Sequence, residues 1–68
     1  MLITLIDALT KAKVAMGELY DAYEHVAFEE FKSGRHDVSK YYIDQANELL
    51  PVLLTVDNEL QKLTEEES

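Results

Sequence analysis

Apolar residues recur along the first half of the chain at alternating intervals of three and four, the spacing of one face of an α-helix. This stripe comprises Leu2, Leu5, Leu9, Ala12, Met16, Leu19, Tyr23 and Val26. Beside it, Ala8, Ala15 and Ala22 follow one another at intervals of seven and would let a neighbouring helix approach closely. The stripe keeps its phase across Gly17, which costs about 1 kcal/mol in a helix interior but does not end a helix. The pattern predicts one helix of roughly 30 residues.

A turn is predicted at residues 33–35. Gly34 suits the left-handed conformation that ends many helices, and Lys32 places a positive charge in the last helical turn. Asp37 suits the N-cap of a second helix. A connection this short makes the two helices antiparallel neighbours.

The second half carries a stripe of the same kind, which passes through Pro51 without losing its phase. It comprises Tyr42, Ala46, Leu49, Leu53, Val56, Leu60 and Leu63. The unbroken phase favours one helix that is kinked at Pro51. The alternative is a third helix that starts near Pro51. The predicted fold is an all-α antiparallel helical hairpin over residues 1–64, followed by a frayed acidic tail over residues 65–68.

Two helices of this length bury one stripe each, and the chain has more apolar residues than that. Either a third helical segment folds back over them or another chain covers them, and a contiguous apolar patch usually marks an interaction site. Tyrosines beside the stripes add a hydroxyl to a large contact area. The residues predicted to bind a protein partner are Tyr20, Phe28, Phe31, Tyr41, Leu50, Val52 and Leu54.

Charge and composition exclude several classes of function. The 68 residues include 14 acidic and 6 basic side chains, giving a formal charge of −8, and no cysteine. Such a surface is repelled by nucleic-acid phosphates and anionic lipids, so we expect no direct nucleic-acid or membrane partner. The apolar start at residues 1–6 is interrupted by Asp7 and is too short for a signal peptide or a membrane span. We therefore expect a cytoplasmic protein.

Catalytic and metal-binding motifs are not evident. Asp21 and His25 share a helical face with Glu18, but Glu-x-x-His and His-Glu-x-x-His motifs do not occur. The sequence lacks a glycine-rich phosphate loop, and we expect no enzyme activity, no cofactor and no metal. The carboxylates allow a different hypothesis, that an acidic face imitates nucleic acid in the binding cleft of another protein. Its candidate residues are Asp21, Glu24, Glu29, Glu30 and Asp44.

The segment from Glu29 to Ala46 resembles the helix–turn–helix junction of tetratricopeptide-type hairpins: a helix ends at Gly34, and Tyr41 and Tyr42 precede Ala46. Over its whole length the chain resembles the small E-component co-chaperones of type III secretion needle subunits. The features that match are the length, the long first helix, the turn at Gly34, the tyrosines that follow and the apolar run to Leu63. Pro51 departs from the straight second helix of that family.

The resemblance implies a cytoplasmic hairpin that packs against a second, tetratricopeptide-like chaperone, with which it keeps the needle subunit monomeric. From the sequence we therefore expect a protein-binding module whose partner is a helical chaperone or a secreted subunit. The alternative is a homodimeric acidic inhibitor or regulator that blocks a macromolecular target.

Overall fold

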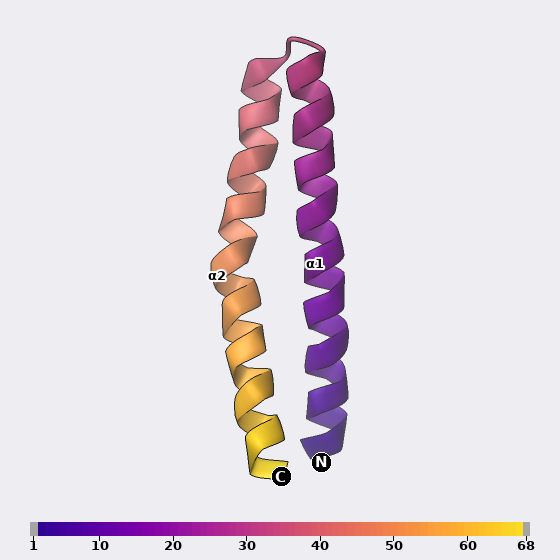
Figure 1. Cartoon of the computed structure of the whole chain (residues 1–68), viewed down its shortest axis with the longest axis vertical. Helices are drawn as coiled ribbons and strands as arrows, with labels where there is room; N and C mark the ends of the chain where they lie inside the picture. The colour runs from indigo at the N-terminus through magenta and orange to yellow at the C-terminus, as the bar shows by residue number, and fades with distance from the viewer. Residues whose placement is uncertain (1, 68) are drawn as a thin grey trace.

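The computed structural model describes residues 2–67, which form two helices and no strand. Helix α1 spans Leu2–Lys32 and helix α2 spans His36–Glu67. The helices lie side by side and antiparallel in a rod of 50 × 15 × 14 Å, with the turn at one end and both chain ends at the other (Figure 1). The prediction of an all-α helical hairpin is confirmed.

The turn is a Schellman motif centred on Gly34. The Arg35 N–H donates to the Glu30 carbonyl (2.9 Å), and the Gly34 N–H donates to the Phe31 carbonyl (3.0 Å). Gly34 has φ = 84°, the left-handed conformation predicted for it. These bonds satisfy carbonyls at the end of α1 and reverse the chain within three residues.

The prediction that Asp37 caps α2 is wrong. Helix α2 begins at His36, and the Ser39 N–H donates to the Arg35 carbonyl (3.0 Å), so Arg35 is the residue that precedes the helix. The turn is too short to leave room for a separate capping residue after Arg35. Asp37 lies instead in the first turn of α2, where its negative charge still opposes the positive end of the helix dipole.

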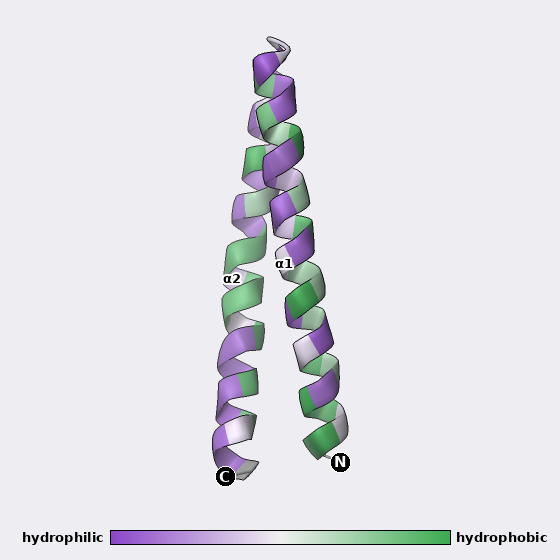
Figure 2. Cartoon of the chain, turned by 45° about the vertical axis from the view of Figure 1, so that its right-hand side comes forward, coloured by the Kyte–Doolittle hydropathy of each residue, from purple (hydrophilic) through white to green (hydrophobic). Residues whose placement is uncertain are grey.

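The stripe predicted for α2 is the one that faces α1. We call the facing positions of the two helices the inner seam. On α2 the inner seam comprises Ser39, Tyr42, Ala46, Leu49, Leu53, Val56, Leu60 and Leu63, all buried or half-buried. Polar and hydrophobic bands alternate along both ribbons, and residues 49–54 form a hydrophobic run in the middle of α2 (Figure 2).

The stripe predicted for α1 is only half right. The inner seam of α1 comprises Ile6, Leu9, Lys13, Met16, Tyr20, Tyr23, Ala27 and Glu30. Leu9, Met16 and Tyr23 belong to both sets, and Ala12 of the predicted stripe is also half-buried. In the structure α1 is rotated so that half of its predicted stripe stays exposed, including Leu5 and Leu19.

Contacts between the helices near the turn explain this rotation. Ala27, Ser39 and Ala46 keep only 2–3% of their surfaces exposed, and the Ser39 hydroxyl donates to the Ala27 carbonyl across the interface (2.7 Å). Small side chains allow the backbones to approach closely here. Helical spacing in α1 allows two neighbouring stripes, and this contact with α2 selects the inner seam although that seam includes the charged Lys13 and Glu30.

Helix α2 continues through Pro51, which excludes the alternative of a third helix. Proline has no N–H for the carbonyl of Asn47, but both residues are exposed, so water can satisfy that carbonyl. Pro51 lies on the side of α2 away from α1, between Leu49 and Leu53 of the inner seam. The Thr55 hydroxyl donates to the Pro51 carbonyl (2.9 Å). A kink at this position stays a prediction.

The predicted division into a hairpin over residues 1–64 and an acidic tail over residues 65–68 stays a prediction. Helix α2 extends to Glu67, so residues 65–67 continue the helix, and Ser68 lies outside the described residues. Leu63 is buried against α1 and anchors the last turns. Glutamate is a good helix former, which favours this extension.

The two glycines provide a matched test of the turn. A Cβ added at either glycine would meet no atom within 4 Å, so only the backbone conformation distinguishes them. We expect Gly34→Ala to lower the free energy of unfolding by about 1–2 kcal/mol, because alanine is strained at positive φ. We expect Gly17→Ala to raise it by about 0.5–1 kcal/mol through helix propensity. Urea unfolding followed by circular dichroism measures both, and equal effects would contradict the turn geometry.

Candidate protein-binding surface

Six of the seven residues predicted to bind a partner have exposed side chains: Phe28, Phe31, Tyr41, Leu50, Val52 and Leu54. Phe28, Phe31 and Leu54 are the most exposed of these, at 58–59% of their surfaces. Tyr20 is different, because it lies half-buried in the inner seam between Met16 and Tyr23. Large apolar side chains exposed to this extent are unusual when they are contiguous.

The structure divides the six exposed residues between two sides of the hairpin. Each residue of an α-helix is rotated by about 100° from the one before it. Phe31 and Leu50 each follow an inner-seam residue, Glu30 and Leu49 respectively, and lie on one side. Tyr41 and Val52 each precede an inner-seam residue and therefore lie on the other side. The sequence prediction did not separate these two groups.

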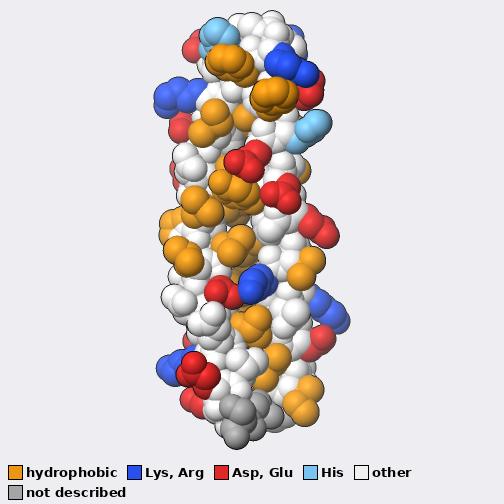
Figure 3. All heavy atoms as spheres, in the orientation of Figure 1, with side chains coloured by type: hydrophobic (Ala, Val, Ile, Leu, Met, Phe, Trp, Pro, Cys, Tyr) orange, Lys and Arg blue, Asp and Glu red, His pale blue; other side chains and the backbone are white. Residues whose placement is uncertain are grey.

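A groove between the helices occupies the first of these sides, close to the turn. It has a volume of about 260 Å³ and is lined by Glu24, Ala27, Phe28, Phe31, Ser39 and Ile43. We call it the turn groove. Hydrophobic side chains gather near the turn on both helices and again along the middle of α2 (Figure 3).

Two ring contacts help to position the phenylalanines of the turn groove. The Phe31 ring stacks on the imidazole of His36 with 4.7 Å between centroids. The Lys32 ammonium lies 5.0 Å from the centre of the Phe28 ring, within the range of a cation–π contact. Both rings are thus supported from the turn while most of their surface faces solvent.

Leu50 and Leu54 extend the apolar surface of the turn groove along α2. Leu50 lies seven residues, two helical turns, beyond Ile43, and Leu54 follows Leu50 by four. We call the combined surface of Phe28, Phe31, Ile43, Leu50 and Leu54 the groove face. It joins four of the predicted partner-binding residues to Ile43 and can accommodate the apolar side of another helix.

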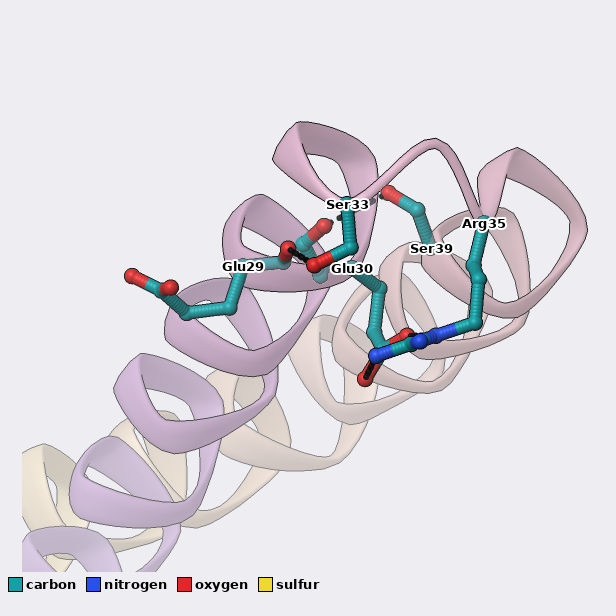
Figure 4. A network of polar contacts seen from close by, with 6 residues as sticks. Glu29, Glu30, Ser33, Arg35 and Ser39 are labelled. Atoms are coloured by element: carbon teal, nitrogen blue, oxygen red, sulfur yellow. Dashed lines mark hydrogen bonds and ion pairs between the residues drawn. The ribbon is translucent and has the colours of Figure 1, made fainter.

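Two ion pairs help to hold the hairpin that carries the groove face. The Lys13 ammonium contacts the Asp57 carboxylate (2.5 Å) across the two helices and is partly buried. Near the turn, the Arg35 guanidinium binds the Glu30 carboxylate through both Nε and Nη2, the latter at 3.2 Å (Figure 4). The hydrogen bonds and charge of Arg35 lower the pKa of Glu30 below its ordinary value of 4.5.

The carboxylates proposed to imitate nucleic acid do not form a uniform acidic array. Glu29 pairs with Lys32 (3.6 Å), Asp44 pairs with Lys40 (3.2 Å), and Glu30 pairs with Arg35. A basic neighbour partly neutralises each of these three negative charges. The geometry therefore favours the apolar groove face over the acidic face as the binding surface.

Metal ligands do not converge within residues 2–67: no group of three or more His, Asp and Glu side chains there could hold an ion. Neither α1 nor α2 has an apolar stretch long enough to cross a membrane.

Four residues that line the turn groove are not among the predicted partner-binding residues: Glu24, Ala27, Ser39 and Ile43. Ile43 lies directly beside Tyr42 of the predicted stripe of α2, and Ser39 belongs to neither predicted set. The signal for Ser39 was available, because it precedes Tyr42 by three and so continues the stripe of α2 toward the turn. A small polar residue in an apolar stripe marks a close helix–helix contact here.

Searches against protein-family models, curated proteins and solved structures find no match to this chain.

The Glu30–Arg35 pair predicts a pH dependence of the turn. The folded-state pKa of Glu30 is depressed, so the pair stabilises the folded chain above the ordinary pKa of 4.5. That stabilisation is lost as the pH falls through the lower, folded-state pKa. We expect carboxyl-carbon NMR titration to place the Glu30 midpoint below 4.5 in the native chain and closer to 4.5 in Arg35→Gln. An identical midpoint in both chains would show that the pair does not form in solution.

Proposed function

We propose that this chain is a non-enzymatic protein-binding module, a small cytoplasmic co-chaperone that packs its hairpin against a helical partner. The observation that carries the proposal is the exposure of the large apolar side chains on the groove face. The partner in this proposal is a second chaperone or a secreted subunit, as the resemblance to needle-subunit co-chaperones implies.

The proposed mechanism is mutual stabilisation. The hairpin covers apolar surface of its partner that would otherwise aggregate, and the partner covers the groove face. Phe28 and Phe31 provide the aromatic anchors, which commonly dominate the energy of an interface. Leu50 and Leu54 extend the contact along α2 and help to exclude water from it. The net charge of −8 keeps the complex soluble.

Binding and folding are linked in this mechanism. A chain of 68 residues buries only about 60% of the surface that its unfolded form exposes. A ligand that binds only the folded state raises its stability by mass action. The proposal therefore predicts that the native partner raises the thermal midpoint of the hairpin as well as binding to it.

Affinity capture from the native host, with mass-spectrometric identification of the bound proteins, tests this function. The expected result is the capture of a helical chaperone or a secreted subunit. The double variant Phe28→Ser/Phe31→Ser should bind this protein on the order of 100-fold more weakly than the native chain does. Tyr41→Ser is the comparison variant, because Tyr41 is equally exposed but lies on the opposite side of α2. Isothermal titration with the purified partner measures all three affinities.

Circular dichroism of both variants checks that the hairpin stays folded, since exposed substitutions usually change stability by no more than about 0.5 kcal/mol. Capture of nucleic-acid enzymes alone, or equal losses of affinity in the two variants, would overturn the assignment of the groove face.

A further inference from the structure

A second apolar stripe runs along α1 outside the inner seam. It comprises Leu5, Ala8, Ala12, Ala15, Leu19, Ala22 and Val26, which follow one another at intervals of three and four. We call it the outer seam. Leu5, Leu19 and Val26 keep 36–44% of their surfaces exposed in the described hairpin, and Ala12 is half-buried.

The outer seam has the position and the spacing of a helix-packing surface. Leu5, Ala12, Leu19 and Val26 each precede an inner-seam residue of α1 by one. The outer seam therefore lies about 100° around α1 from the inner seam. A helix at a corner of a four-helix bundle meets its two neighbours at nearly this angle. The outer seam is continuously apolar over about 32 Å of helix.

We propose that a second copy of this chain covers the outer seam from Leu5 to Ala22, so that two α1 helices pair antiparallel and the two hairpins form a four-helix bundle. The first argument is the alternation of large and small side chains. Antiparallel pairing can place Leu5 opposite Ala22, Ala8 opposite Leu19 and Ala12 opposite Ala15, so that each leucine meets an alanine. A parallel pair would instead place Leu19 against Leu19 and Ala15 against Ala15, which crowds one layer and leaves the next empty.

Charge complementarity provides the second argument. Lys11 and Glu18 are exposed and border the outer seam, because each precedes one of its residues. In the antiparallel pairing, Lys11 of each copy lies close to Glu18 of the other copy. The two positions differ in height along the helix axis by only about 3 Å. The two-fold symmetry therefore gives the same attractive pair twice. Shifting the register by one heptad would bring together the two copies of Glu18 in one direction, or the two copies of Lys11 in the other.

The location of this interface explains a residue that the groove face does not use. Val52 precedes an inner-seam residue of α2, so it lies on the same side of the hairpin as the outer seam. The pairing overlaps residues 5–22 of α1, the half of the hairpin nearer the chain ends. The turn groove lies outside the overlap, so the second copy and the proposed helical partner use separate surfaces.

Sedimentation equilibrium from micromolar to millimolar concentrations, with two matched variants, tests the proposal. We expect the native chain to approach twice its mass of 7.8 kDa. Ala15→Glu puts a charge in the centre of the interface and should weaken association on the order of 100-fold. Val14→Glu adds the same charge at the adjacent position, but Val14 follows an inner-seam residue and lies on the groove side, so this variant should still dimerise.

A charge exchange tests the register and does not depend on Ala15. Lys11→Glu and Glu18→Lys should each weaken the dimer, and the double variant should restore it. Lys11 also pairs with Asp7 of its own chain (3.0 Å), but that contact cannot account for restoration by the double variant. Phe28→Ser/Phe31→Ser should remain dimeric, which separates this proposal from the proposed function. A native chain that stays monomeric at millimolar concentration, or equal behaviour of Ala15→Glu and Val14→Glu, would overturn the proposal.

Discussion

Two antiparallel helices can bury only the stripe that each presents to the other, and the rest of this structure depends on that limit. At the closest approach, near the turn, the buried side chains are the small ones of Ala27, Ser39 and Ala46. No large side chain among the described residues is fully buried. The apolar residues that remain are distributed over the groove face and the outer seam, on opposite sides of the inner seam. Their exposure is a consequence of the two-helix architecture, because no third element exists in the described chain to cover them.

Polar contacts determine how the two helices face each other. The Ser39 hydroxyl bonded to the Ala27 carbonyl is worth about 1 kcal/mol in net stability. Its larger effect is on geometry, because it fixes the rotation of α1 and so decides which apolar residues are hidden. The Lys13–Asp57 pair holds the same alignment farther from the turn. Both contacts join residues that are distant in sequence, so each depends on the hairpin being closed.

These contacts explain which features of the structure could be predicted from the sequence and which could not. Local signals were sufficient for both helices, for Gly34 and for the α2 stripe, because each depends on residues within a few positions. The α1 stripe was partly wrong because Leu5 and Ile6 fit helical spacing equally well, and only the contact with α2 distinguishes them. Asp37 was misplaced because the Schellman motif puts Arg35 directly before α2, so that Asp37 already lies in the first helical turn. Exposure of the groove-face residues was predicted from the apolar surplus, but their grouping with Ile43 required the rotation of each helix.

Methyl NMR of the isolated chain with a soluble paramagnetic probe tests the central claim most directly, at a concentration where the chain is monomeric. Leu53 and Leu54 are adjacent, but Leu53 lies in the inner seam and Leu54 on the groove face. The account predicts strong relaxation of the Leu50 and Leu54 methyls, weak relaxation for Leu63 and an intermediate effect for Leu53. Equal protection of Leu54 and Leu63 in the monomer would show that the hairpin covers its own apolar surface, and would contradict the account.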